Sequence, residues 1–462
     1  MYKTIIIKNS VSNCLNELGL LRDAVTEDGS VFCIVRTEYK DGRVEKDFMD
    51  VIQEGMRSGF DYVNTMVIPE KTERLDNALY CVWLVKNRNR YYFDKDKIRE
   101  KSIWKDVEWG KRAKNYNSKG KDPGNVWIPT VDDGKANITE HILLTIEEVY
   151  SRLLSMTLAK GDRYLLVSDV ENDFEFGDFE GEKRISETKY EDVDFGEYVG
   201  DKEISNCAGK CLGKVVFGTA EAMDVIDGHS VDLIVTSPPY WDLKNYYKKN
   251  QIGQEPYDVY AKRMYVVWKQ CFDKLKDDGS LWININIRMR NGEPILLPKL
   301  FIDECRKIGF FYRGILIWHK SSGIPTSSRN LSDHHEYVLV FTKSRSSKIN
   351  RDAFGDYSDY KNEAISGKLF WNINRKAGSV GQNTIHPAIF PTELVNRITQ
   401  ISTREGDMVV DPFLGSGTSL IASLNNHRRF VGYEYFEGFK SLMSERFEAE
   451  IDDCSASDTE FC

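Results

Sequence analysis

The sequence predicts an α/β fold that is present twice in one chain of 462 residues. Between about residues 213 and 445, apolar runs rich in β-branched residues alternate with segments of helical periodicity, which is typical of a sheet covered by helices. One of these predicted strands leads into a glycine-containing loop and then a helix. A long pattern in the first third of the chain also recurs at a spacing of 250 residues. Hydrophobic residues make up 41% of the chain, enough for a sizeable core.

The second half of the chain supplies most of the predicted elements. One helix has apolar residues at helical spacing, ends at Asp277-Asp278-Gly279 and leads into a strand. Residues 343–383 are rich in Ser, Arg, Lys, Asn and Gly and predict no regular structure. In chain order the expected elements are a strand from Val231, the helix Tyr257–Lys276, the strand Leu281–Ile287, a helix over about Pro294–Ile308, strands near Phe311–Trp318 and Glu336–Thr342, and strands from Met408 and Phe430.

The strand from Val231 must end at Pro238-Pro239, because two prolines in a row cannot continue a ladder or start a helix in the ordinary way. The loop is stiff and offers no backbone N–H at those two positions, so its carbonyls are left as acceptors. Ser237 adds a hydroxyl acceptor and Tyr240 a flat aromatic face. These groups suit a planar heterocycle with an exocyclic amino group, although a lone Pro-Pro-Tyr is also common as a surface turn.

A second stretch, Met408 to Ala422, indicates a buried strand, a loop and a helix start. Gly415 and Gly417 let the backbone approach a ligand closely, and helix N–H groups then point at that ligand. A third strand ends in Glu434, roughly 20 residues after this loop, where a doubly wound fold places a ribose-binding carboxylate. The pattern favours a nucleoside cofactor.

Together these stretches resemble the amino-methyltransferases of DNA, which transfer a methyl group from S-adenosylmethionine (SAM) to an exocyclic base nitrogen. Ser237-Pro238-Pro239-Tyr240 matches the catalytic loop of that family, and Asp411 to Thr418 matches its cofactor loop. The catalytic loop comes first, which resembles the circularly permuted beta class. In that class Thr-Ser-Pro-Pro-Tyr-Trp is most typical of cytosine-N4 enzymes. The resemblance covers about residues 213 to 445.

The resemblance implies a Rossmann-like, SAM-dependent methyltransferase sheet with permuted motif order. The Ser237 hydroxyl and the Pro238 carbonyl would accept hydrogen bonds from the target amine, while Tyr240 stacks on a base flipped out of double-stranded DNA. One departure is Gly218-Thr219, where the family commonly has Gly-Asp; Glu221 follows two residues later. The implied catalytic residues are Ser237, Pro238, Pro239 and Tyr240, and the implied cofactor-binding residues are Asp411, Pro412, Phe413, Gly415, Gly417, Thr418, Glu434 and, in a positioning role, His386.

Three other functions stay open at this point. Adenine-N6 methylation of DNA uses the same fold, and a few permuted enzymes with Ser at the first loop position act on adenine. Protein-glutamine methylation is disfavoured, because that family uses Asn-Pro-Pro-Tyr in an unpermuted order. A DNA-binding module without catalytic activity is disfavoured by the two intact loops.

The repeat places Glu27 to Phe32 on Asp277 to Trp282, and the register then holds without a gap to Tyr62 and Tyr312. Further on, at a spacing of 245 residues, Gly161-Asp162 falls on Gly406-Asp407. We therefore expect residues 1–168 to be a degenerate, amino-truncated copy of the methyltransferase half, here called the first copy. It should begin after the point of a catalytic loop, and it has Leu166 to Glu171 where the other half has the glycine loop, so it should bind no SAM.

The first copy is either a packing remnant or a DNA-contacting domain. The segment from Gly110 to Lys121 carries five basic residues, no acid and an aromatic, as a loop that follows phosphates requires. A solvated, flexible loop would have a similar composition. The candidate DNA-binding residues are Lys111, Arg112, Lys114, Lys119 and Lys121.

The net charge of −9 is unevenly distributed. We expect residues 169–203 to be an acidic linker, 204–444 the catalytic domain (the second copy), and 445–462 an acidic tail, which leaves a net positive remainder for DNA. The expected partners are double-stranded DNA and a cognate restriction endonuclease for the same site. No signal peptide or membrane span is apparent, which favours the cytoplasm. No metal site is expected, since Cys207 and Cys211 lack a second pair.

Overall fold

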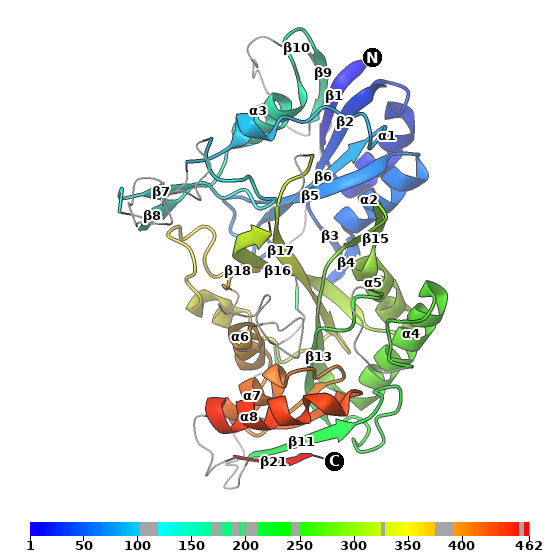
Figure 1. The fold of residues 1–462 in the computed structure, drawn as a ribbon, viewed down its shortest axis with the longest axis vertical. Coiled ribbons are helices and arrows are strands. Elements are labelled where there is room, and N and C mark those ends of the chain that lie inside the picture. The colour runs from blue at the N-terminus through cyan, green and yellow to red at the C-terminus, as the bar shows by residue number, and fades with distance from the viewer. Residues whose placement is uncertain are drawn as a thin grey trace.

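We describe a computed structural model of the chain, covering residues 1–101, 119–135, 137–168, 176, 179–185, 194–195, 198–199, 211–242, 250–324, 329–374, 391–451 and 457–461. The two halves of the chain are stacked along the long axis of the molecule, with the N-terminus at one end and the C-terminus at the other (Figure 1). Among these residues no helix is long and apolar enough to cross a membrane.

The first copy is built on a six-stranded sheet in the order β10-β9-β1-β2-β6-β5. Its strands alternate in side-chain direction and, apart from the edge strand β10, are buried over most of their length because helices cover the sheet. The elements are β1 (Tyr2–Lys8), α1 (Val11–Leu21), β2 (Val25–Val35), β3 (Glu38–Lys40), β4 (Arg43–Lys46), α2 (Phe48–Arg57), β5 (Asp61–Pro69), β6 (Ala78–Val85), β7 (Thr130–Asp132), β8 (Ile138–His141), α3 (Ile146–Thr157), β9 (Arg163–Ser168) and β10 (Glu180–Ile185).

The second copy is built on a nine-stranded sheet in the order β18-β16-β17-β13-β12-β19-β20-β11-β21. The elements are β11 (Cys211–Phe217), β12 (Val231–Thr236), α4 (Tyr257–Lys274), β13 (Leu275–Ile285), β14 (Arg288–Arg290), β15 (Glu293–Ile295), α5 (Leu297–Ile308), β16 (Phe311–Ile324), β17 (Asp333–Thr342), β18 (Phe370–Asn372), α6 (Thr392–Ser402), β19 (Met408–Asp411), α7 (Thr418–Asn425), β20 (Arg429–Glu434), α8 (Lys440–Glu450) and β21 (Ser457–Phe461).

The two sheets have the same topology, so the internal repeat is structural. Six strands of the second copy, in the order β20-β19-β12-β13-β17-β16, correspond one for one to the whole sheet of the first copy. In both sets of six strands, the third strand (β1 or β12) pairs in parallel on both sides, and the last two pairs (β2 with β6 and β6 with β5, or β13 with β17 and β17 with β16) are antiparallel. The sequence register that aligns β2 with β13 and β9 with β19 is thereby confirmed.

The first copy starts earlier in the fold than the sequence register indicated. β1 takes the place of β12, so the chain begins with the strand that precedes a catalytic loop rather than after that loop. Matching Val31 of β2 with Leu281 of β13 sets Lys8 and Asn9 where the second copy has Ser237 and Pro238. The prediction was wrong because the connection between these two strands is much shorter in the first copy, which shifts the register upstream of residue 25.

Two acidic segments contribute strands. Within the predicted linker, Glu180–Ile185 forms β10 and extends the first copy to Ile185. Within the predicted tail, the chain continues α8 and then forms β21, which pairs in parallel with β11 at the sheet edge. Charged side chains are tolerated at both places because each strand is an edge strand.

The predicted start of α5 was also early, since Glu293–Ile295 forms β15 against β14.

The two copies meet through equivalent elements. Helix α2 of the first copy lies against α5 of the second, and Phe48 at the start of α2 packs on Tyr337 of β17 with ring centroids 5.3 Å apart. The Tyr312 hydroxyl donates to Asp47 across the junction at 3.1 Å. One hydrophobic core runs through both halves. The arrangement is that of a two-fold dimer whose subunits are joined in one chain.

Candidate active site

Three predicted segments come together at one edge of the second sheet. β12, β19 and β20 are neighbours and run in parallel, so their carboxyl ends share that edge. The catalytic loop follows β12, the glycine loop follows β19, and Glu434 is the last residue of β20. The Thr236 hydroxyl donates to Asp411 at 2.7 Å, which ties the two loops together at their roots. Crevices at the carboxyl ends of parallel strands are where α/β sheets bind ligands.

Most of the catalytic loop's carbonyls are already engaged. The Tyr260 hydroxyl donates to the Pro239 carbonyl at 2.6 Å. Arg288 donates to the carbonyls of Tyr240 at 3.0 Å and Asp242 at 2.7 Å, and also to that of Trp241. These bonds fix the loop's path without using its first two residues.

Two acceptors of the loop stay available. Within the described part of the chain, neither the Ser237 hydroxyl nor the Pro238 carbonyl has a hydrogen-bonding partner. They are the two groups that the sequence predicted would accept a target amine. Tyr240, which is half-buried, follows Pro238 two positions later in the same loop.

Tyr240 is held by a buried ion pair that the sequence analysis did not single out. Its hydroxyl donates to Glu336 of β17 at 2.9 Å, and Glu336 also accepts from Asn284 at 2.8 Å and Lys320 at 2.8 Å. Burial opposes ionisation of Glu336, but the Lys320 charge and these hydrogen bonds outweigh it and lower the pKa of the carboxyl. In the sequence, Lys320 and Glu336 are visible only as charged residues near the ends of apolar strands. Many strand ends carry such residues, so the sequence did not indicate that these two would pair.

The glycine loop is folded around Asp411. This buried carboxylate accepts from the Thr236 and Ser419 hydroxyls and, at 2.9 Å, from the Phe413 N–H. Burial raises the pKa of Asp411 to about 6, against the lowering effect of those bonds. Gly415 and Gly417 have φ of 58° and 85°, a region that other residues enter with strain. Pro412 and Phe413 lie in the same loop, and Thr418 is the first residue of α7.

Glu434 braces the loop from the neighbouring strand. Its carboxylate accepts from the Gly415 N–H at 2.8 Å and the Phe436 N–H at 2.7 Å. Burial raises the pKa of Glu434 to about 7 despite these backbone bonds. Each oxygen keeps a second lone pair, so the carboxylate can still accept from ligand hydroxyls.

Arg446 completes the loop from a segment that the sequence assigned to the tail. Its guanidinium donates to the Ser416 carbonyl at 2.9 Å and to the Ser416 and Thr418 hydroxyls at 3.0 Å each. Glu450, one turn along α8, holds the same guanidinium. A solitary arginine in an acidic run gave no sign of this role.

The position that departs from the family pattern has its own partner. Glu221 receives two hydrogen bonds from Arg263 of α4, at 2.9 and 2.6 Å, and one from the Thr219 hydroxyl. The Arg263 bonds lower the pKa of the Glu221 carboxyl. The ion pair between Glu221 and Arg263 therefore links the segment after β11 to α4.

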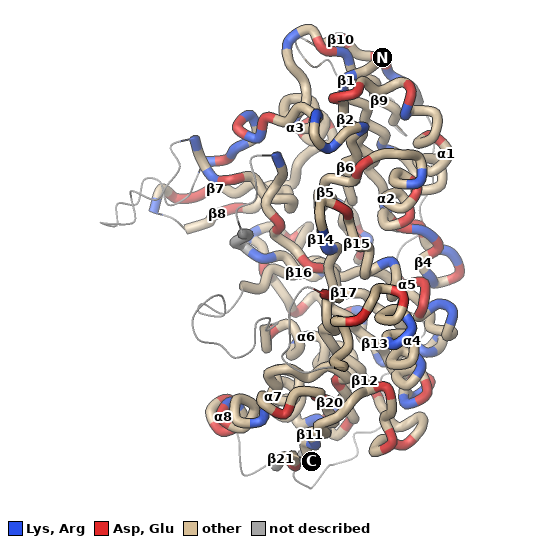
Figure 2. Tube along the Cα trace, turned by 45° about the vertical axis from the view of Figure 1, so that its right-hand side comes forward, with Lys and Arg blue, Asp and Glu red and all other residues tan. Residues whose placement is uncertain are grey.

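Several predicted residues lie elsewhere. His386 falls outside the described residues, as do Lys111, Arg112 and Lys114. Lys119 is in an ion pair with Asp96 at 2.5 Å, and the Lys121 backbone N–H donates to Glu100 at 2.8 Å. Figure 2 shows basic and acidic positions interspersed along both halves, so the described residues do not by themselves outline one basic face.

Residues 231–445 match the protein family described as DNA methylase, and these residues lie in the half of the chain that carries the nine-stranded sheet. The type II methyltransferase M.SmaI of Serratia marcescens is 29% identical over 268 residues, 50% of this chain and 90% of that protein. The type II methyltransferase M.MjaI of Methanocaldococcus jannaschii is also 29% identical, over 50% of this chain and 90% of that protein.

Two solved structures are similar over the same half. A putative DNA modification methylase from Thermus thermophilus, complexed with S-adenosyl-L-methionine, has a TM-score of 0.40 and 26% identity, covering 54% of this chain and 97% of that one. The cytosine-N4-specific PvuII DNA methyltransferase has a TM-score of 0.43 and 21% identity, covering 52% and 90%.

Proposed function

We propose that the second copy, a DNA methylase domain over residues 231–445, transfers a methyl group from SAM to the N4 amine of cytosine in double-stranded DNA. The observation that carries the proposal is a pair of acceptors at the start of the catalytic loop, the Ser237 hydroxyl and the Pro238 carbonyl, which have no hydrogen-bonding partner among the residues that the structure describes. The alternative is adenine-N6 methylation, since both bases carry an exocyclic amine.

The two acceptors do the chemical work on the amine. Its lone pair is delocalised into the base, so hydrogen bonds accepted from the NH₂ group favour a tetrahedral nitrogen with its lone pair available for attack. Ser237 and Pro238 sit on a loop held by Arg288 and Tyr260, so they need little reorganisation. Positioning and preorganised acceptors of this kind can account for a large part of a rate enhancement.

The residues around the glycine loop fit SAM. Gly415 and Gly417 adopt left-handed conformations that other residues enter with strain, and the Glu434 carboxylate has lone pairs for ribose hydroxyls. SAM supplies an activated methyl group on a sulfonium. Asp411 and Arg446 do not need to touch it, because each holds the loop that does.

The substrate base must leave the duplex to reach these acceptors, which lie at the sheet edge. A flipped base would stack on the ring of Tyr240, which belongs to the same loop. The relatives named above are type II methyltransferases, which supports a restriction-modification setting and a cognate endonuclease for the same site. The basic segment of the first copy, Lys111, Arg112, Lys114, Lys119 and Lys121, is proposed to contact phosphates beside the target.

Product analysis tests the proposal. Purified protein is incubated with SAM and unmethylated double-stranded DNA, and the digested nucleosides are separated by mass spectrometry. N4-methylcytosine is expected, and N6-methyladenine would establish the alternative. Ser237→Ala should reduce the product by orders of magnitude with nearly unchanged SAM affinity in calorimetry. Full turnover by that variant would remove the loop from the mechanism.

A further inference from the structure

The polar residues that hold Tyr240 lie on three neighbouring strands. Asn284 is near the carboxyl end of β13, Glu336 near the start of β17 and Lys320 on β16. In the ion pair between Lys320 and Glu336, the lysine side chain is 3% exposed and the glutamate side chain 18% exposed, so the pair is largely shielded from water. A buried pair of this kind is rigid, because breaking it would leave a charge without a partner.

This cluster restricts the rotation of the Tyr240 ring. The hydroxyl donates to Glu336 at one end of the side chain, and Arg288 fixes the Tyr240 carbonyl at the other. A ring held at both ends keeps one plane, and a stacking face is useful only if its plane matches that of the base. The ion pair thus sets the orientation of a residue that would touch the substrate.

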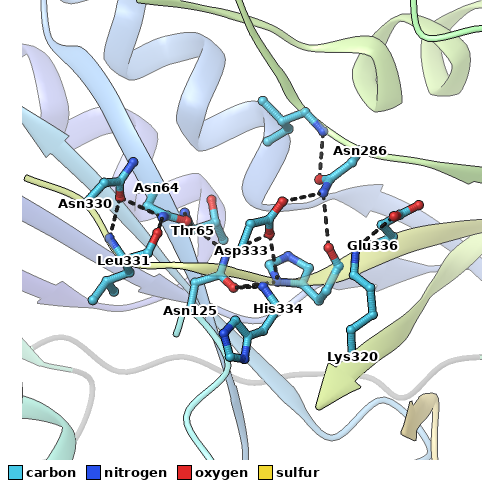
Figure 3. Close-up of polar contacts among 12 residues, drawn as sticks. Asn64, Thr65, Asn125, Asn286, Lys320, Asn330, Leu331, Asp333, His334 and Glu336 are labelled. Atoms are coloured by element: carbon cyan, nitrogen blue, oxygen red, sulfur yellow. Dashed lines mark hydrogen bonds and ion pairs between the residues drawn. The ribbon is translucent and has the colours of Figure 1, made fainter. Parts of the chain in front are cut away.

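The first copy reaches the same strand. Asn125, only 2% exposed, accepts from the His334 N–H at 2.9 Å and donates to Asp333 at 3.2 Å (Figure 3). Its own backbone N–H donates to the Ser332 carbonyl at 2.9 Å. The segment is so close that a Cβ at Gly124 would lie 2.8 Å from the His334 ring. Asn125 is therefore hydrogen-bonded to Asp333 and His334, the first two residues of β17. Glu336 lies two residues further along the same strand.

The hydrogen bonds of Asn125 continue into the sheet of the first copy. Asn125 donates to Asn64 of β5 at 3.0 Å, and Asn64 donates to Asn330 at 2.8 Å, just before β17 begins (Figure 3). The Ser332 hydroxyl donates to Asp122 at 2.8 Å. The amino end of β17 is thus fixed from the sheet of the first copy.

We propose that Glu336 is a positioning residue that orients Tyr240 for stacking, and that Asn125 of the first copy keeps the strand carrying Glu336 in place. The first copy is then part of the catalytic apparatus, whether or not it contacts DNA. This inference rests on the proposed function, since it assigns a role in the same methyl transfer.

The test is a double-mutant cycle on steady-state kinetics with the full-length protein. Tyr240→Phe keeps the ring and removes the hydroxyl, while Glu336→Gln keeps the shape and removes the charge. Each should lower kcat about tenfold, as expected for one lost hydrogen bond to a charged group, with unchanged affinity for SAM. The double variant should be about as slow as either single variant, because both remove the same interaction. Multiplying effects, about 100-fold together, would overturn the proposal.

A second arm tests the first copy. Asn125→Ala and the milder Ser332→Ala should lower kcat, and the effect of each should shrink in the Glu336→Gln background. Tyr312→Phe is the matched control, since it also removes a buried hydrogen bond between the copies but lies away from Glu336. It should lower thermal stability and leave kcat unchanged. If Asn125→Ala does not fold, Ser332→Ala decides; loss of stability without loss of kcat would overturn the role of the first copy.

The parent's product separates this inference from the proposed function. N6-methyladenine together with coupled Tyr240 and Glu336 variants would overturn the cytosine assignment and support the positioning role. N4-methylcytosine with independent variants would do the reverse. A parent that transfers no methyl group to DNA would overturn both.

Discussion

The two copies share a sheet and differ at the strand ends. By the aligned registers, Ile7, Leu166 and Ile185 of the first copy occupy the places of Thr236, Asp411 and Glu434 of the second. All three differences replace a polar residue by an apolar one near the carboxyl end of a parallel strand, two of them on the inner strands β1 and β9 and one on the edge strand β10. The strands therefore determine the fold that the two copies share. The last residues of β12, β19 and β20 distinguish the site of the second copy from the first copy.

The difference has an energetic side. Ile7 and Leu166 are 0% and 1% exposed, and burying such a side chain stabilises a fold by about 1.5 to 3 kcal/mol. In the second copy Asp411 and Glu434 are buried instead, with pKa values raised to about 6 and about 7. Buried carboxyls cost stability unless donors satisfy them. Burial of Asp411 and Glu434 therefore lowers the stability of the second copy at the positions that shape its ligand loop. The first copy has apolar residues there and does not lose this stability.

The largest effect is expected from making the second copy resemble the first. Asp411→Leu leaves the Thr236 and Ser419 hydroxyls and the Phe413 N–H without their acceptor, each costing about 1 to 3 kcal/mol. The glycine loop should lose its conformation and SAM binding should fall below detection in calorimetry. Asp411→Asn keeps one oxygen acceptor and should retain measurable binding. Equal SAM affinity for both variants and the parent would show that Asp411 does not shape the loop.

The reciprocal change tests whether one acid makes a site. Leu166→Asp puts a carboxylate into the first copy at a buried position that pairs with Ile6 of β1 and packs in a hydrophobic cluster. An unpaired buried charge should destabilise the protein by about 3 to 5 kcal/mol, measured by chemical denaturation. Calorimetry should still find one SAM site per chain, because Leu166 to Glu171 has no glycine for the close approach. A second SAM site would contradict the view that the first copy has lost cofactor binding.

The sequence predicted the sheet of the second copy and its two loops, because Pro238-Pro239 and the glycines impose backbone conformations that need no distant partner. It also revealed the repeat, through turn residues such as Gly42 and Gly292. It did not reveal Glu336, Lys320, Arg446 or Asn125, whose roles depend on strands and helices far apart in the chain. β1 and β21 were missed because a short apolar run and an acidic run acquire partners only in the folded sheet.

The DNA-binding hypothesis for the first copy predicts a smaller, salt-dependent effect. Neutralising Lys111, Arg112, Lys114, Lys119 and Lys121 together should weaken binding to every DNA sequence, and each lost phosphate contact should lower the salt slope by roughly 0.9. Binding is measured by fluorescence anisotropy across a salt series, with SAM affinity as the internal control for folding. An unchanged salt slope would leave the first copy with only its packing and positioning roles.

The smallest effect is a difference in pH dependence that only the second copy should show. The folded-state pKa of Glu434, about 7, lies above the ordinary value of 4.5. Between these two pH values the folded protein keeps a proton on Glu434 that the unfolded chain has released. The stability from this group is fully present below about pH 4.5 and is lost as the pH rises through about 7. Ile185 in the first copy has nothing to titrate.

Glu434→Gln removes that titration while keeping an oxygen for the Gly415 or Phe436 amide. Between pH 5 and pH 8 the parent should therefore lose more stability than the variant, by at most about 3 kcal/mol. Denaturant titrations at the two pH values measure the difference, and Glu445→Gln, an exposed acid on α8, is the matched control and should follow the parent. Parallel losses in parent and Glu434→Gln would mean that Glu434 stays ionised in the folded protein. Its backbone hydrogen bonds would then outweigh burial, and the contrast with Ile185 would be one of shape rather than of charge.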